Sequence, residues 1–423
     1  MTLELRRILV DLTPLLPGAA NGGAKPLARS LVAELSALAP HIEFTLLASG
    51  PGYADLADLE RPNVRRENVD VDLVQPEANG LAVAGARVAA RGLANTLLPP
   101  RARMWVKDSA WTLFKRWQRT TVTRMARTDL VFCPFTAPFF FDPSVPLVSV
   151  VHDLQFLEYP DFFEARQQTH RHQHFLDACR LADRLICVSE FTRQTVLANS
   201  HLSAERVQTI HSSLVHSFVP DERASELTAG VLERIGLRSR RFLLYPANPW
   251  PHKNHRLLIE AFARYRRSAP ESDLGLICTG APGAVADQLA KFALGATPPG
   301  SVVFAGYLPE LEFVALLQNC RGLIFPSLYE GFGLPVLEAM NCGRPVLCSN
   351  VTSLPEVVGD AALLFDPRDA ADIAQAIGRL ESEPALEQQL VQRGHARASL
   401  FGDARGMAAQ YLAVFEDVVA FRR

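Results

Sequence analysis

Short apolar runs alternate with helical segments along the chain, and the alternation restarts once near the middle. Strands are expected at RRILVDL, IEFTLLAS, DLVFCP, PLVSVVHD, RLICVS and VQTIHS, and a second series starts at RFLLYPANP. A polar, charged stretch near residues 216–240 separates the two series. Alternating strands and helices are typical of parallel α/β folds. We therefore predict two doubly wound parallel-sheet domains that face a central cleft.

The chain has 423 residues, too many for one ordinary core. We expect a first Rossmann-like domain over residues 1–218, with an insertion at about 81–127. A second Rossmann-like domain is expected over 219–395, and helices over 396–423 are expected to cross back to the first.

The bulk composition excludes some classes of protein. The formal net charge is −2, which argues against a dedicated nucleic-acid binder. The seven cysteines are scattered without a C-x-x-C pair, which indicates buried thiols in a reducing compartment. The sequence shows no apolar run long enough to span a membrane and no signal peptide, so a cytoplasmic protein is expected.

The stretch YEGFGLPVLEAMNCG holds two glutamates eight positions apart, Glu330 and Glu338. Two glycines and Pro335 make a helix that begins at Glu330 improbable, so Glu330 is expected on a loop after the apolar run GLIFPS. Pro335 suits the first turn of a helix, which places Glu338 about one turn in. Bare amides beside a helix N-terminus favour an anion, and carboxylates accept bonds from sugar hydroxyls. Alternatively, both glutamates are helix-start charges or salt-bridge partners.

The longer string YEGFGLPVLEAMNCGRPVLCSNVTSLPEVVGDAALLFDP closely resembles the E-x7-E region of family 4 glycosyltransferases, mannosyltransferase-like enzymes with the GT-B fold. The resemblance covers most of residues 240–380 and, more loosely, 130–220. It implies that the second domain binds a nucleotide sugar and the first binds the acceptor. It also implies transfer with retention of anomeric configuration.

By this resemblance, Glu330 would hold the donor sugar near the reacting carbon, and Glu338 would bond the nucleotide ribose. Backbone amides in the same loop would meet the sugar and the diphosphate. These amides belong to Gly331, Phe332, Gly333 and Leu334.

The segment ANPWPHKNHRLLIEAF resembles the lysine-bearing loop and helix of the same family, so Lys253 would neutralise the diphosphate leaving group. Ala247 replaces the family's usual glycine, and Asn248, counted with the donor-binding residues, stands where a basic residue is often found. His252 stands where a second cation is frequent. The plain alternative is an exposed lysine at a helix start.

In the first half, VVHDLQF ends a strand with His152 and Asp153, where the family often carries a histidine that contacts the donor sugar or helps the acceptor react. NGGAK resembles the family's glycine-rich first loop, so Gly22 and Gly23 are expected to approach the diphosphate and Asn21 the acceptor. The alternatives are a structural histidine and a flexible turn. The loop lacks the G-x-G-x-x-G spacing, which argues against nicotinamide binding.

Two patterns resemble metal sites, but no metal is expected. The D-x-D at residues 70–72 alternates with valines like an edge strand, and HRHQH at 170–174 lacks a third ligand. A third segment, between Arg87 and Arg127, holds ten Lys and Arg, one acid and three tryptophans. It is either an amphipathic helix on anionic lipid or a helix packed on the first domain.

The expected activity is a retaining, metal-independent hexosyltransferase without a cofactor. The donor is GDP-mannose or, alternatively, a UDP-sugar, and the acceptor is a glycan or lipid-linked glycan for a surface polysaccharide. A glycan phosphorylase on the same fold is one alternative; it would use inorganic phosphate, and a requirement for pyridoxal phosphate would favour it. A non-catalytic nucleotide-sugar-binding partner is another. The expected location is cytoplasmic, and at the inner face of the cytoplasmic membrane if the basic segment lies on lipid.

Overall fold

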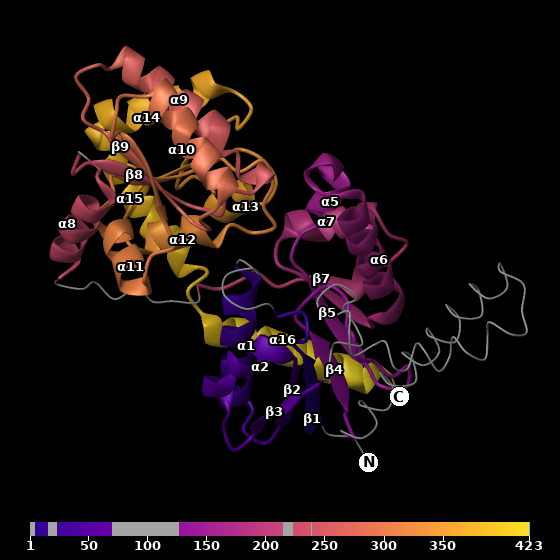
Figure 1. The fold of residues 1–423 in the computed structure, drawn as a ribbon. Helices are drawn as coiled ribbons and strands as arrows, with labels where there is room; N and C mark the ends of the chain where they lie inside the picture. Colours follow the sequence, from indigo (N-terminus) through magenta and orange to yellow (C-terminus); the bar gives the residue numbers. More distant parts are fainter. Residues whose placement is uncertain (1–4, 16–22, 70–126, 215–222, 238, 423) are drawn as a thin grey trace, which may run out of the picture.

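The computed structural model describes residues 5–15, 23–69, 127–214, 223–237 and 239–422. Its two parallel sheets form two bodies joined along one side (Figure 1). We call the first sheet with the helices that cover it the N-terminal lobe, and the second sheet with the helices that cover it the C-terminal lobe. The predicted architecture of two doubly wound sheets is confirmed.

The first sheet has seven strands in the order β3-β2-β1-β4-β5-β6-β7. They are β1 (Arg7–Asp11), β2 (Glu43–Ala48), β3 (Val64–Asn68), β4 (Leu130–Cys133), β5 (Leu147–Val151), β6 (Arg184–Cys187) and β7 (Val207–Thr209). The second sheet has six strands in the order β10-β9-β8-β11-β12-β13. They are β8 (Phe242–Pro246), β9 (Gly275–Thr279), β10 (Val302–Gly306), β11 (Gly322–Phe325), β12 (Val346–Ser349) and β13 (Leu363–Phe365).

Both sheets follow the same path. The chain starts on a central strand, adds two strands outward, and then returns to the other side of the central strand. The order therefore reverses between β1 and β4 in the first sheet and between β8 and β11 in the second. Loops that leave such neighbouring strands diverge and expose a place for ligands beyond the carboxyl ends. The fold therefore favours a ligand site at the loops after β8 and β11.

Helices cover both faces of each sheet. In the N-terminal lobe these are α1 (Ala24–Leu38), α2 (Gly50–Ala54), α5 (Gln155–Glu158), α6 (Ala165–Leu181), α7 (Glu190–Ala198) and α16 (Ala404–Phe421). In the C-terminal lobe they are α8 (Ala224–Ile235), α9 (His255–Ser268), α10 (Ala284–Ala296), α11 (Glu310–Asn319), α12 (Leu334–Asn341), α13 (Leu354–Val358), α14 (Ala370–Ser382) and α15 (Pro384–Ser399).

Alternate residues of one strand enter different apolar clusters, because successive side chains point to opposite faces of a sheet. Ile8 and Val10 of β1 pack in the cluster that holds Phe415 of α16. Leu9, between them, packs with Phe175 of α6. This explains why the strands read as continuous apolar runs rather than alternating ones.

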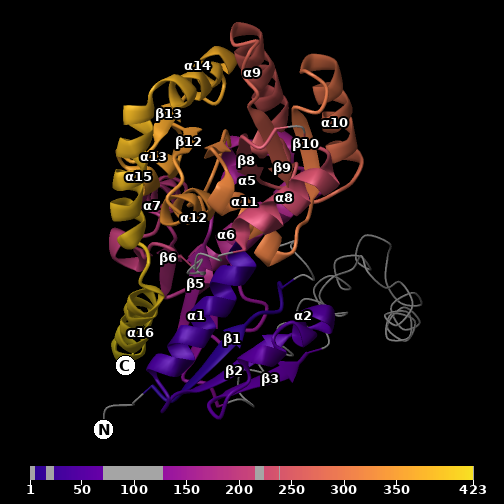
Figure 2. The same cartoon turned by 90° about the vertical axis from the view of Figure 1, so that its left-hand side faces the viewer.

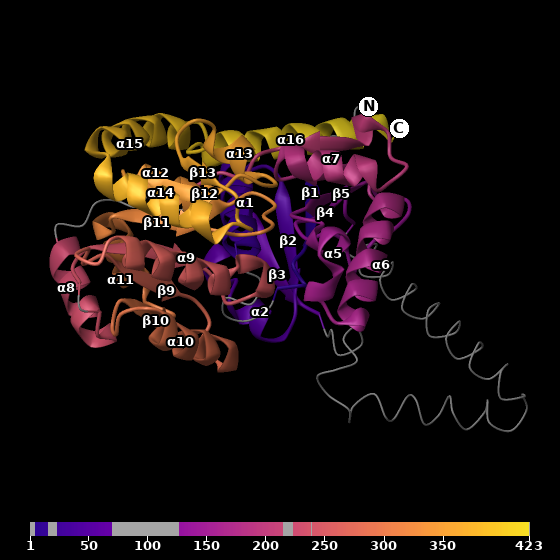
Figure 3. The ribbon, with the colours of Figure 1, turned by 90° about the horizontal axis from the view of Figure 1, so that it is seen from above.

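The last helix returns to the N-terminal lobe. α14, α15 and α16 follow one another down one side of the molecule (Figure 2), and α16 lies along α1 when seen from above (Figure 3). Tyr411 and Phe415 of α16 pack on Phe132 of β4, with ring centroids 5.8 and 5.0 Å apart. Where the chain crosses, the amide of Leu214 donates to the carbonyl of Phe401 at 2.9 Å. The two lobes are therefore connected twice.

The structure differs from the sequence expectations at three elements. Helix α8 lies inside the polar stretch that was expected only to interrupt the pattern, and strand β13 was not expected. The edge strand β3 precedes the predicted one at NVDVDLV, of which residues 70–74 lie outside the described part of the chain. Among the described residues, no helix is both long and apolar enough to cross a bilayer. All seven cysteines are free thiols, five of them buried.

Candidate active site at the switch point of the second sheet

Lys253 and Glu330 form an ion pair at the point where the order of the second sheet reverses. Lys253 ends a short 3₁₀ helix (Pro251–Lys253) after β8, and Glu330 lies on the loop after β11. Lys253 Nζ lies 2.5 Å from Glu330 Oε1, and each side chain is 13% exposed. The alternative of a solvated lysine is therefore wrong, whereas the salt-bridge alternative for Glu330 describes a real contact.

The loop that carries Lys253 is fixed by side chains on both sides of it. The Tyr245 hydroxyl donates to the Lys253 carbonyl oxygen. Asn254, which follows with a left-handed φ of 59°, donates from Nδ2 to the carbonyl oxygens of Pro326 at 3.2 Å and Pro367 at 2.7 Å. These contacts connect the loop to the segments after β11 and β13. They fix the backbone of Lys253 and so restrict the position of its ammonium group.

The Glu330 loop rests on the segment that precedes α13. The amide of Glu330 donates to Thr352 Oγ1 at 3.1 Å, and Ser353 Oγ lies 3.0 Å from the carbonyl oxygens of both Glu330 and Phe332. Thr352 adopts a φ of 58°, which costs a non-glycine residue about 1–2 kcal/mol. The loop and the start of α13 therefore form one hydrogen-bonded block.

Gly331 is the point where the C-terminal lobe touches the end of β5. A Cβ added at Gly331 would lie 1.8 Å from the carbonyl oxygen of His152, far inside van der Waals contact. The Gly331 carbonyl accepts a bond from Ser189 Oγ at 2.7 Å and lies 3.3 Å from Thr192 Oγ1. Only a glycine permits this approach, and the approach brings His152 beside the Glu330 loop.

Helix α12 begins after Gly333, as the sequence predicted, with Pro335 in its first turn. Gly333 has a φ of 105°, and a Cβ there would lie 2.7 Å from Leu354 Cδ2. Gly23, the residue before α1, comes close to the same helix start: its Cβ would lie 3.6 Å from Leu334 Cδ1. Asn21 and Gly22, the other members of the first loop, lie outside the described residues.

His152 is held neutral in a fixed tautomer. Its Nε2 lies 2.7 Å from the Pro134 carbonyl oxygen, and because a carbonyl only accepts, Nε2 carries the proton. Burial lowers the pKa of His152 below its usual value. Nδ1 is therefore an acceptor for a hydroxyl group. Asp153 accepts the amide of Gln155 at 3.1 Å, which is a turn contact rather than a ligand contact.

Two further predicted residues occupy different environments. Burial raises the pKa of Glu338, on α12, from 4.5 to about 7. Asn248 Oδ1 accepts the amide of Ala281 at 2.8 Å and the hydroxyl of Tyr307 at 3.0 Å, which connects the loops after β8, β9 and β10. Its side-chain oxygen is thus engaged within the C-terminal lobe.

Burial, together with the charge of Lys253, lowers the pKa of His252 to about 3. His252 is therefore uncharged near neutral pH, and Lys253 is the cation at this loop. The described residues hold no group of three or more His, Cys, Asp or Glu side chains that could bind a metal. The D-x-D at 70–72 lies outside the described part of the chain.

Sequence reasoning missed a second group of contacts between the lobes. Glu356 on α13 accepts bonds from the N-terminus of α7 and from His211, after β7. Tyr329 packs its ring on Tyr159 and Phe191, with centroids 6.3 and 5.6 Å away. Glu356 lies in the TSLPEVV part of the long string that resembles family 4 glycosyltransferases, and this was the available signal. The sequence analysis assigned it no role.

Two family models match the chain over most of this architecture. Residues 62–214 match the model described as Glycosyltransferase Family 4, and residues 235–397 match the model described as Glycosyl transferases group 1. The two matches fall on the N-terminal and C-terminal lobes respectively.

The curated relatives are also glycosyltransferases. The chain is 32% identical over 256 residues to the O-antigen chain mannosyltransferase B of Escherichia coli, covering 60% of this chain and 66% of the relative. It is 28% identical over 221 residues to the serotype-specific mannosyltransferase WbdA of the same species, covering 52% of this chain but only 27% of WbdA. The chain thus spans less than two thirds of the length of either relative.

Among solved structures, a glycosyltransferase from Rickettsia africae superposes with a TM-score of 0.69 at 14% identity. The match covers 98% of this chain and 99% of that one. At this identity the likeness concerns the fold, and it agrees with the GT-B arrangement of two facing sheets.

Proposed function

We propose that this chain, whose two lobes match glycosyltransferase family models, is a family 4 enzyme that transfers mannose from GDP-mannose to a growing surface glycan, with retention of configuration and without a metal. The mannosyl donor and the surface glycan are inferred from the names of the relatives in Escherichia coli. A lipid-linked acceptor and a location at the inner face of the cytoplasmic membrane belong to the same proposal. The basic segment at 87–127 that suggested them lies outside the described residues, apart from Arg127.

One observation carries the proposal: the Lys253–Glu330 pair stands beside the N-terminus of α12, at the switch point of the second sheet. Departure of a nucleoside diphosphate develops negative charge, which a fixed ammonium and the amides of a helix start stabilise. A bound diphosphate would compete with Glu330 for Lys253. Released from Lys253, the Glu330 carboxylate would accept bonds from hydroxyls of the sugar.

The reaction we propose needs no protein nucleophile. The acceptor oxygen bonds to the anomeric carbon on the face that the diphosphate leaves, while the bond from that carbon to the phosphate oxygen breaks. The acceptor proton passes to the departing phosphate oxygen. His152 Nδ1 would orient a hydroxyl by accepting its hydrogen, so the chain contributes positioning and charge stabilisation.

A donor screen tests this proposal. Purified protein is mixed with GDP-mannose, UDP-glucose, UDP-GlcNAc, UDP-galactose or dTDP-rhamnose, with and without EDTA, and thermal stability and slow donor hydrolysis are measured. We expect GDP-mannose to stabilise the protein and to be hydrolysed equally with EDTA present. Glu330→Ala should weaken hydrolysis. A response to a UDP-sugar alone would replace the donor, and binding without turnover of any donor would favour a non-catalytic nucleotide-sugar-binding protein.

A further inference from the structure

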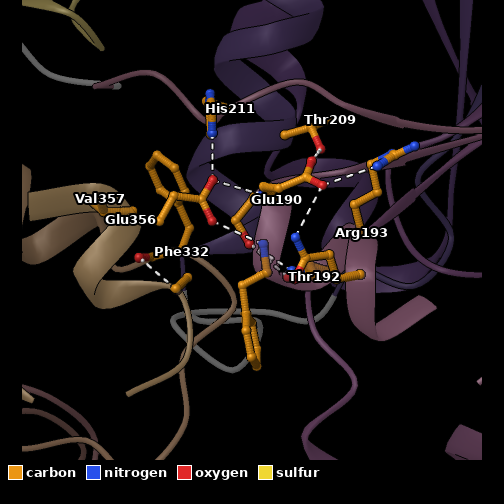
Figure 4. A network of polar contacts seen from close by, with 12 residues as sticks. Glu190, Thr192, Arg193, Thr209, His211, Phe332, Glu356 and Val357 are labelled. Carbon is orange, nitrogen blue, oxygen red and sulfur yellow. Dashed lines mark hydrogen bonds and ion pairs between the residues drawn. The ribbon is translucent and has the colours of Figure 1, made fainter. Parts of the chain in front are cut away.

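The N-terminus of α7, in the N-terminal lobe, is completed by a carboxylate from the other lobe. Glu356 Oε1 accepts the Glu190 amide at 2.7 Å, and Oε2 accepts the Phe191 amide at 2.9 Å (Figure 4). Within its own lobe, α7 is capped by Ser189, whose Oγ accepts the Thr192 amide at 3.1 Å. The first amides of a helix have no partner inside it and lie at the positive end of its dipole. Glu356 therefore accepts hydrogen bonds from amides that need an external acceptor, and its negative charge lies at the positive end of the helix dipole.

A third donor fixes the same carboxylate. His211, on the segment after β7, places Nε2 2.7 Å from Glu356 Oε1. Burial opposes the ionisation of Glu356, but the bonds from His211 and the two amides outweigh it, so the net pKa of Glu356 is lowered. Glu356 stays ionised near neutral pH. We call Glu356, His211 and the first two residues of α7 the interdomain clasp.

The clasp connects directly to the Glu330 loop. Glu356 follows Thr352 and Ser353, the residues that hold the backbone of that loop. On the other side, Ser189, the N-cap of α7, donates to the Gly331 carbonyl at 2.7 Å. The start of α7 in the N-terminal lobe thus bonds both to Glu356 of α13 and to Gly331. These two residues belong to the hydrogen-bonded block formed by the Glu330 loop and the start of α13.

The outer side of α13 is supported as well. Arg397 of α15 donates from Nε to the Val357 carbonyl at 2.8 Å and, from its other end, to the carbonyl of Glu356. The ring of Phe401, at the crossover into α16, lies 5.6 Å from the ring of His211. The clasp therefore stands between the candidate active site and the place where the chain crosses between lobes.

We propose that the interdomain clasp is a positioning device that holds the two lobes closed, with Glu356 as its central residue. By seating α13 on α7, it keeps Gly331 against the His152 carbonyl and so sets the spacing between the groups of the two lobes. Glu356 itself contacts neither His152 nor the Lys253–Glu330 pair. Its loss acts through the placement of the Glu330 loop. The kinetic part of this inference rests on the proposed transferase function, whereas its structural part does not.

The test compares the full-length wild type with Glu356→Gln and with Glu312→Gln. The first variant keeps the size of the side chain, but an NH2 group replaces one of the two carboxylate oxygens. An NH2 group cannot accept a hydrogen bond, so one donor of the clasp loses its acceptor, and the negative charge at the start of α7 is lost. Glu312 is a matched control, because it also accepts two bonds, from Arg234, but entirely within the C-terminal lobe. His211→Gln, which leaves both helix amides bonded, is the graded variant.

Hydrogen–deuterium exchange and donor turnover are measured on each protein. In Glu356→Gln we expect exchange about tenfold faster at 190–192 and in the 329–334 loop, with the strands of both sheets unchanged. We expect kcat to fall about tenfold or more while the donor KM changes less than about threefold, because donor-contacting groups are intact. His211→Gln should show the same pattern at smaller size, and Glu312→Gln should match the wild type.

The proposal is overturned if exchange in the 329–334 loop and kcat both stay within about twofold of the wild type. It is also overturned if exchange rises equally in β8 and β11, since that pattern indicates general loss of stability. If the wild type turns over no donor but the local exchange changes appear, the proposed transferase function fails and the clasp stands.

Discussion

The two switch points of this molecule occupy equivalent places in their sheets but use charge in opposite ways. At the first, Asp11 ends β1 and is fully buried. Its carboxylate accepts the Thr13 amide at 3.1 Å, the Thr13 hydroxyl at 2.6 Å, and the amides of Phe139 at 2.5 Å and Phe140 at 3.1 Å. Every donor comes from its own lobe, so this carboxylate fastens two loops to each other.

At the second switch point, the charges face each other across the loops. Lys253 and Glu330 are paired mainly with one another, and each keeps some exposure. The Asp11 carboxylate already accepts four hydrogen bonds and has little capacity for a ligand. Lys253 and Glu330 can instead exchange their contact with each other for contacts with a phosphate and a sugar hydroxyl. The comparison teaches that position in the fold permits a site, while the number of donors around a charge decides whether it serves structure or binding.

The largest effect that the comparison predicts is on Lys253. We expect Lys253→Ala to lower kcat/KM by roughly 10²–10³, the usual range for losing one group that stabilises charge in the transition state. The melting temperature should change little, because the substitution breaks a single ion pair, with Glu330, whose carboxylate keeps some exposure to water. Steady-state kinetics with the donor found in the screen measures this.

Lys291→Ala, at an exposed position on α10, is the matched control and should behave as wild type. A fall of less than about threefold in Lys253→Ala would mean that Lys253 is only the structural counterion of Glu330.

Sequence reasoning reached the second switch point more fully than the first. The start of α12 after Gly333 and the loop position of Glu330 were both predictable, because glycine and proline act on the backbone next to them. Helix α8 was not predicted, although its apolar residues have helical spacing; they lie inside a stretch rich in charged residues, and their face packs on α11.

Contacts between distant segments could not be predicted either. The approach of Gly331 to His152, and the bond from Glu356 to the start of α7, join residues more than a hundred positions apart. Nothing local in the sequence distinguishes a glycine required by a neighbouring lobe from one required by a turn. The family resemblance indicated which strings matter, and the packing shows what some of them do.

The next largest effect is expected where the lobes meet. Gly331→Ala places a methyl group on the His152 carbonyl, so the lobes must separate or the loop must move. We expect kcat to fall by about 10–100-fold, because misplacement of about 1 Å near the chemistry can cost that much. Kinetics and small-angle X-ray scattering would measure the change in rate and in the dimensions of the molecule.

Gly230→Ala is the control, since this exposed glycine of α8 has nothing within 4 Å of an added Cβ. Alanine there should stabilise the helix by about 0.5–1 kcal/mol. If Gly331→Ala retained wild-type kcat, the contact between the lobes would not belong to the active arrangement.

The third prediction concerns the first switch point. Asp11→Asn turns amide hydrogens toward some of the donors that the carboxylate now accepts, which leaves buried N–H groups without a partner. We expect unfolding free energy to fall by about 2 kcal/mol, with kcat per folded molecule nearly unchanged. Chemical denaturation and active-site-normalised kinetics separate the two quantities. A large loss of kcat with intact stability would place Asp11 among the groups that act on the substrate and would end the contrast.

The smallest effect is expected at Glu338. Its substitution tests whether an ionised Glu338 lowers the stability of the C-terminal lobe while it binds the nucleotide ribose. Burial raises the pKa of Glu338 from 4.5 to about 7, so the folded protein holds this proton more tightly than the unfolded chain. Proton binding to Glu338 therefore favours the folded state, and this contribution to the free energy of unfolding is fully present below pH 4.5. It is lost as pH rises through 7, which lowers the free energy of unfolding by at most about 3 kcal/mol. Glu338→Gln removes the titration.

Relative to the wild type, Glu338→Gln should melt roughly 2–4 °C higher at pH 8 and at nearly the same temperature at pH 5. Donor affinity at pH 8 should fall about fivefold, because a neutral amide is a weaker acceptor for ribose hydroxyls than a carboxylate. Glu383→Gln, at an exposed pair with Arg379, should not raise the melting temperature at either pH. A melting temperature of Glu338→Gln that rises equally at both pH values would show that its gain comes from packing, and Glu338 would then join Asp11 as a structural carboxyl group.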